Sequence, residues 1–75
     1  MKTERDRMEF EGKVIESNRG MFRVQLDEGL IVQCTLSGKI RQNAVKILVD
    51  DRVKVEVSEY SPERGRIVYR YKAGD

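Results

Sequence analysis

Apolar residues recur at every second position through most of this chain, and that period limits the folds open to it. The segment RVKVEVS is the clearest case, because Val53, Val55 and Val57 alternate with charged side chains. Successive side chains of a β-strand point to opposite faces, so this spacing predicts strands with one buried face. The same alternation predicts five strands, at residues 8–16, 21–27, 30–36, 51–58 and 66–72.

The segments between these strands have the composition of turns. SNRG at 17–20, EG at 28–29 and SPERG at 61–65 contain glycine or proline, which favour the backbone angles of tight turns. Gly12 falls inside the first strand, where a glycine often marks the bend of a strand around a barrel corner. Alternation also places four aromatic residues in the inward series, as core residues: Phe10, Phe22, Tyr69 and Tyr71.

Residues 36–49 break the two-residue period. Ser37 is a suitable helix N-cap. The apolar residues that follow recur at the spacing of one helical face, and these are Ile40, Ala44, Ile47 and Leu48. Because Val45, Ile47 and Val49 also alternate, the spacing predicts only one or two helical turns before the chain extends again.

Three strands, a short helix and two further strands predict an all-β fold. Five strands this short cannot hide both faces as a flat sheet, whereas closure into a barrel removes the exposed edges. A helix between the third and fourth strands is the order of the five-stranded oligonucleotide/oligosaccharide-binding barrel, the OB-fold. We expect a single domain over residues 1–75, with its core at about 8–72 and flexible ends at 1–7 and 72–75.

The composition argues against catalysis. The chain has no histidine and a single cysteine, Cys34, so it offers no imidazole base, no internal disulfide and no ordinary zinc site. Asp50 and Asp51 are the densest pair of carboxylates, but they fall at a turn, where turn chemistry explains them. We expect no enzymatic activity, no metal and no cofactor. The sequence has neither an apolar leader nor an apolar run of about 20 residues, so we expect a cytoplasmic protein without a membrane partner.

Positive charge collects in two segments. Residues 36–49 carry three cations and no acid, and residues 61–75 carry four cations against two acids. Helical spacing places Lys39 and Lys46 on one side of the predicted helix, together with Gln42 and Asn43. If the fold brings the two segments together, their cations form a surface suited to nucleic-acid phosphate. If it does not, they are ordinary solvated charge.

Strand alternation extends this pattern. It places Arg66, Arg70 and Lys72 on one outward face of the last strand, while Arg23 projects outward from the second strand. The outer face around the second and third strands of an OB barrel is the usual platform for nucleic acid. The residues alone therefore favour a small RNA-binding barrel.

Three stretches together resemble a known family in order and spacing. They are GMFRVQLDEG, then LSGKIRQNAVKIL with the following DRVKVEVSEY, and finally RGRIVYR, and the family is bacterial-type translation initiation factor one. The resemblance implies a single OB domain that binds the small ribosomal subunit at the aminoacyl-tRNA site. It implies contacts with ribosomal RNA of the decoding region and with a neighbouring ribosomal protein. Such a factor blocks premature tRNA entry, supports initiation factors two and three, has no small-molecule substrate and is monomeric when free.

The resemblance also assigns roles to individual residues. It carries RNA contacts over to Arg23, Lys39, Arg41, Arg64, Arg66 and Arg70, with Lys46 where the family usually has arginine. With the polar and basic neighbours described above, the candidate RNA-binding residues are Arg23, Lys39, Arg41, Gln42, Asn43, Lys46, Arg64, Arg66, Arg70 and Lys72.

Two other functions fit the sequence. A general single-stranded RNA binder or RNA chaperone of cold-shock type would favour exposed aromatic residues on the platform strands, and this sequence places them inward. A protein-interaction barrel would carry its basic segments only for solubility. Tight binding to short unstructured oligonucleotides would support the first alternative, and absence of salt-sensitive RNA binding would support the second.

Overall fold

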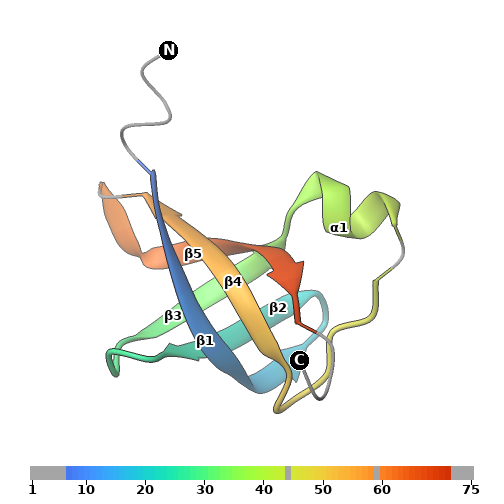
Figure 1. Ribbon diagram of the computed structural model, residues 1–75, viewed down its shortest axis with the longest axis horizontal. Helices are drawn as coiled ribbons and strands as arrows, with labels where there is room; N and C mark the ends of the chain where they lie inside the picture. Colours follow the sequence, from blue (N-terminus) through green and yellow to red (C-terminus); the bar gives the residue numbers. More distant parts are fainter. Residues whose placement is uncertain (1–6, 44, 59, 72–75) are drawn as a thin grey trace.

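The computed structural model describes residues 7–43, 45–58 and 60–71 of the chain. The flexible ends expected at 1–7 and 72–75 lie outside these residues, apart from Arg7, which begins the first strand. The elements follow the predicted order, with one short helix after the third strand (Figure 1). They are β1 (Arg7–Asn18), β2 (Met21–Leu26), β3 (Ile31–Leu36), α1 (Gly38–Gln42), β4 (Arg52–Ser58) and β5 (Ser61–Arg70).

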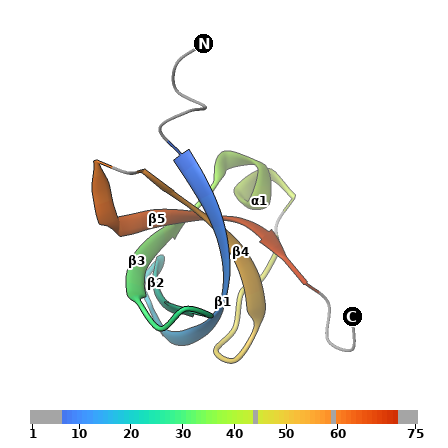
Figure 2. The ribbon, with the colours of Figure 1, turned by 60° about the vertical axis from the view of Figure 1, so that its left-hand side comes forward.

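The five strands close into a barrel in the order β1-β2-β3-β5-β4. β3 and β5 run parallel, and every other neighbouring pair is antiparallel. α1 lies outside the wall and packs next to β5, as Figures 1 and 2 show from two directions. The expected OB-fold barrel, with its helix between the third and fourth strands, is confirmed. No helix within the described residues has the length and apolar character needed to span a bilayer.

β1 pairs with both β2 and β4, and Gly12 lies where the two pairings overlap. Gly12 pairs with Leu26 of β2 and also with Val53 of β4. A Cβ atom at this position would lie 2.5 Å from the carbonyl oxygen of Gln25, so only glycine fits without a backbone shift. The close approach of β2 is therefore the physical reason for glycine at this position of β1.

Most of the inward series of the strands forms the core, as alternation predicts, but Met8, in the same series as Phe10, is 51% exposed. Phe22 is buried and Phe10 packs against the buried cluster. The other buried strand residues are Val14, Val24, Leu26, Val32, Cys34, Val53, Val55, Val57 and Ile67.

β5 begins earlier than the sequence predicts. The turn expected at residues 61–65 is instead the first part of the strand. Its pairing with β4 is irregular there, because Ser58 pairs with Ser61 whereas Val57 pairs with Gly65. The extra residues form a bulge between these pairs, which is how a segment containing proline is accommodated next to a strand.

A second bulge in β5 overturns the predicted faces of its last residues. Val68 has no partner in β4, although Ile67 and Tyr69 on either side of it do. One inserted residue reverses inside and outside beyond it. Tyr69, predicted as core, is therefore 51% exposed, and Arg70 pairs with Val53, an inward residue. The prediction that Arg70 shares an outward face with Arg66 is wrong for the same reason.

α1 is the short helix predicted after the third strand. The Ser37 hydroxyl accepts a hydrogen bond from the Ile40 N–H at 3.2 Å, which confirms the N-cap. Ile47 is buried although it lies beyond the helix, whereas Leu48 is 52% exposed, so the helical face does not extend to Leu48. Ala44 lies outside the described residues.

Candidate nucleic-acid interface

Lys39 of α1 lies beside the cations of β5. It lines one hollow together with Arg66 and Tyr69, and a second hollow together with Arg70 and Tyr69. Asn43, at the C-cap of α1, also lines the second hollow. The fold thus brings the two basic segments together, which was the condition for a common cationic surface.

A row of polar side chains crosses three neighbouring strands. Arg23 of β2 pairs with Gln33 of β3, which pairs with Arg64 of β5, and all three are exposed. Arg64 and Arg66 line a further hollow. We refer to Arg23, Lys39, Arg64 and Arg66 as the cationic face. Gln33 was not among the predicted site residues, although its outward position in the third strand could have indicated it.

The cations of α1 and of the adjoining segment have no acidic partner in the part of the chain that the structure describes. Among the described residues, Lys39, Arg41, Lys46 and Arg64 form no ion pair within 4.0 Å, and α1 has no acid in its first turn. Their charge is therefore available to a polyanion. Arg41 and Gln42 are exposed on α1 but line none of the hollows next to β5.

Arg23 and Arg66 of the cationic face do have partners. Arg23 is 3.3 Å from Glu16 of β1, and Arg66 is 3.2 Å from Glu56 of β4. The Arg23–Glu16 pair is exposed and is worth about 0–1 kcal/mol, whereas the Arg66–Glu56 pair is partly buried. Phosphate can therefore replace Glu16 as the partner of Arg23 at little cost.

Arg70 faces a backbone group. Its Nη1 atom donates a hydrogen bond to the Lys46 carbonyl at 2.9 Å, which ties the segment after α1 to the end of β5. Lys46 itself is exposed. Lys72, the last candidate residue, lies outside the described residues.

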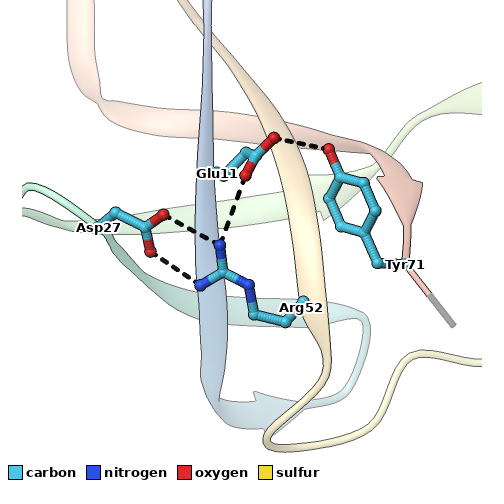
Figure 3. Close-up of polar contacts among 4 residues, drawn as sticks. All are labelled: Glu11, Asp27, Arg52 and Tyr71. Atoms are coloured by element: carbon cyan, nitrogen blue, oxygen red, sulfur yellow. Dashed lines mark hydrogen bonds and ion pairs between the residues drawn. The ribbon is translucent and has the colours of Figure 1, made fainter. Parts of the chain in front are cut away.

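On another part of the wall, the cations are neutralised by carboxylates (Figure 3). Arg52 forms two hydrogen bonds with Asp27, at 2.8 and 2.9 Å, and a third with Glu11 at 3.5 Å. Glu11 in turn accepts a hydrogen bond from the Tyr71 hydroxyl at 2.8 Å. Tyr71, predicted as core, is thus half-buried and tied to the surface by this bond. Lys13 of β1 forms an ion pair with Asp50, in the loop before β4, with 3.9 Å between the ammonium nitrogen and a carboxylate oxygen.

This network changes the acidity of its members. The hydrogen bond from Arg52 lowers the pKa of Asp27 below its ordinary value. The hydrogen bond to Glu11 raises the pKa of Tyr71, because the carboxylate favours the protonated hydroxyl. These four residues link four parts of the chain. Asp27 lies in the β2–β3 hairpin, Glu11 in β1, Arg52 in β4 and Tyr71 directly after β5. Their role is structural.

The described residues offer little for catalysis. No three of their His, Cys, Asp or Glu side chains gather as a metal site. Burial raises the pKa of the Cys34 thiol to about 12, so it is not a nucleophile near neutral pH. What the surface provides is positive charge beside an exposed aromatic ring, which is the chemistry of nucleic-acid binding.

Comparisons with known proteins agree with this geometry. A family model described as translation initiation factor 1A / IF-1 matches residues 1–75. The solution structure of translation initiation factor one from the Wolbachia endosymbiont strain TRS of Brugia malayi has a TM-score of 0.77 and 36% identity. That alignment covers 99% of this chain and 87% of that chain.

Two larger proteins contain a similar barrel. The crystal structure of YjeQ from Thermotoga maritima has a TM-score of 0.76 at 29% identity, and YloQ, a circularly permuted GTPase, has 0.77 at 22%. Each alignment covers 91% of this chain and 24% of the larger one. The likeness to YloQ shows the fold alone.

Proposed function

The chain belongs to the translation initiation factor 1A / IF-1 family, and from that membership we propose that it binds the small ribosomal subunit at the aminoacyl-tRNA site. In this role it contacts ribosomal RNA of the decoding region and a neighbouring ribosomal protein. By occupying the site it blocks premature entry of tRNA, and it supports initiation factors two and three. It does this as a cytoplasmic monomer, by binding and without catalysis.

The position of Lys39 is the observation that carries this proposal. Lys39 has no acidic partner among the described residues, and it lines both hollows beside β5, one with Arg66 and the other with Arg70. A carboxylate in α1 would repel RNA phosphate, which explains why residues 36–49 contain none. In the proposed complex, the cationic face and Arg41 bind phosphate. Gln42 and Asn43 add polar contacts at the end of α1, and Lys72 adds charge beyond β5.

Arg70 has a different role in this proposal. Because its guanidinium holds the Lys46 carbonyl, Arg70 is a positioning residue that fixes the segment carrying the Lys46 ammonium group. Lys46 is then the group that meets phosphate.

One observation favours a second candidate, general binding of single-stranded RNA. Tyr69 is half-exposed and lies beside Lys39, and aromatic rings beside cations stack on unpaired bases in OB domains. On this interpretation, short unstructured oligonucleotides bind as tightly as the ribosomal subunit does.

Cosedimentation with isolated small and large ribosomal subunits across a salt series tests the proposal. We expect selective binding to the small subunit, with affinity that falls steeply as salt rises. Equal binding to both subunits and to a short unstructured oligonucleotide would favour the second candidate. Absence of salt-sensitive binding to any of these RNAs would favour a protein-interaction barrel.

A further inference from the structure

One carboxylate lies among the cations of the cationic face. Glu56 of β4 lines one hollow together with Arg64 and Arg66, and a second hollow together with Arg66 and Lys39. Among the described residues, it is the one acid common to both hollows. A carboxylate repels phosphate, so an acid at this place opposes the binding of RNA. Its presence there needs a separate physical reason.

The contact between Glu56 and Arg66 suggests that reason. The two residues are direct cross-strand partners of β4 and β5, with 3.2 Å between the carboxylate oxygen and the guanidinium nitrogen. Their side chains are 25% and 41% exposed, whereas those of Glu16 and Arg23 are 55% and 60% exposed. A pair that is fixed by strand register and partly shielded from water holds its guanidinium group in one direction. Glu56 thus positions Arg66 and also offsets its charge.

A second acid makes this carboxylate costly to displace. Glu9 of β1 lies directly opposite Glu56, lines the same hollow, and is 3.7 Å from Lys54. A phosphate that took the place of Glu56 at Arg66 would bring three negative groups together at this point. Like charges directly opposite on neighbouring strands are destabilising, and a third anion adds to their repulsion. Phosphate therefore replaces Glu56 less readily than it replaces Glu16.

We propose that Glu56 determines specificity, because it holds Arg66 in the direction that the folded RNA of the small subunit requires and withholds it from unstructured RNA. Unstructured RNA binds through charge alone, so it gains little from a guanidinium group whose charge is already offset. A folded RNA meets Lys39, Arg64 and the positioned Arg66 together, and these contacts outweigh the repulsion. Selection of one partner by a group that repels the others is a general route to specificity. This inference rests on the proposed function.

Glu56→Gln tests the role of this carboxylate, since glutamine has nearly the same size and no charge. We expect its affinity for a short oligouridylate, measured by fluorescence anisotropy, to rise about threefold at about 0.1 M salt. The log–log salt slope for that oligonucleotide should steepen by about 0.7, as one more cation becomes available to phosphate. Affinity for the small subunit, measured by cosedimentation, should not rise, because the added charge is offset by the lost orientation of Arg66. The ratio of the two affinities therefore falls.

Two control variants separate the carboxylate from packing and from net charge. Glu56→Asp keeps the acid, so its affinity for oligouridylate and its salt slope should remain close to those of the parent. Glu28→Gln makes the same change in net charge within the hairpin before β3, at the opposite end of β3 from α1. Glu28 lines none of the hollows that contain Lys39, Arg64 or Arg66, so this variant should keep the parent ratio of affinities.

The role of Glu56 is wrong if Glu56→Gln raises both affinities by the same factor or raises neither. It is equally wrong if Glu28→Gln lowers the ratio as much as Glu56→Gln does, because net charge alone would then account for the effect. Lys39→Ala, in the same cosedimentation series, tests the proposed function separately. If Lys39→Ala binds the small subunit more weakly while Glu56→Gln keeps the parent ratio, the proposed function stands and this inference fails. If Lys39→Ala binds as tightly as the parent, the proposed function fails as well.

Discussion

The guanidinium group of Arg70 holds the backbone carbonyl of Lys46, with 2.9 Å between the donor nitrogen and the oxygen. This bond joins the last residue of β5 to the segment that connects α1 with β4. The side chain of Lys46 remains exposed. Arg70 thus positions the segment between α1 and β4, and Lys46 presents its charge to solvent.

Substitution of these two residues should have different effects. Arg70→Ala removes the bond, so we expect the free energy of unfolding to fall by about 1 kcal/mol and the amides of residues 45–47 to exchange faster. Lys46→Ala keeps the carbonyl, so it should change neither quantity but should lower the salt slope of binding by about 0.9. Urea unfolding and amide exchange measure the first pair of effects. Unchanged exchange of Val45 and Ile47 in Arg70→Ala would contradict the positioning role.

The bond between Arg52 and Asp27 predicts a dependence of stability on acid. The pKa of Asp27 is lowered in the folded chain, so the carboxylate stabilises the fold above its ordinary pKa of 3.8. This contribution is lost as the pH falls through the lower, folded-state value. Asp27→Asn should therefore be less stable than the parent at pH 7 and should lose less stability as the pH falls from about 5 to about 2.

Glu28→Gln is the matched control, because Glu28 is the next acid along the same hairpin and forms no ion pair among the described residues. Urea unfolding at a series of pH values compares the two variants. If the free energy of unfolding falls equally with pH in Asp27→Asn and in the parent, the pair does not stabilise the fold.

The thiol of Cys34 should resist labelling in the folded protein. Burial raises its pKa to about 12 from an ordinary 9.0, so at about pH 8 the thiolate is about a thousandfold rarer than in the unfolded chain. A thiol-specific chromogenic reagent should thus react at least about a thousand times more slowly without urea than with it. Labelling at similar rates in both conditions would mean that Cys34 is not in the core.

The close approach of β2 to Gly12 predicts a large effect of a single methyl group. Gly12→Ala places a Cβ atom 2.5 Å from the Gln25 carbonyl oxygen, and we expect a loss of about 2–3 kcal/mol in the free energy of unfolding. Gly38→Ala is the control, because a Cβ atom there meets nothing within 4 Å. Alanine also favours the helix, so Gly38→Ala should be neutral or stabilising by up to about 1 kcal/mol. Equal effects of the two changes would contradict the packing at Gly12.

The strands could be predicted from the sequence because alternation records burial directly. Val53, Val55 and Val57 show the period without interruption, and each of them is in the core. The prediction failed near the end of β5, where Val68 is one extra residue relative to β4. Val68 is a strong β-former with no local sign of a bulge, so no pattern in the sequence indicates that Tyr69 and Arg70 change faces.

The candidate site was predictable in part. The absence of acids around Lys39 is visible in the sequence, and the helix and last strand do lie together. The partners of the other cations depend on contacts between distant segments, such as Arg66 with Glu56 and Arg70 with the Lys46 carbonyl. No local pattern encodes these, so charge alone could not distinguish a paired cation from a free one.

The salt dependence of small-subunit binding by Lys39→Ala combined with Arg41→Ala tests the central claim most directly. Lys13→Ala, which removes a cation paired with Asp50, is the control and should keep the parent slope within error. If the unpaired cations of α1 bind RNA phosphate, the double variant binds more weakly and its log–log slope falls by about 1.8. Parent affinity and parent slope in the double variant would show that the surface beside α1 does not bind the ribosome.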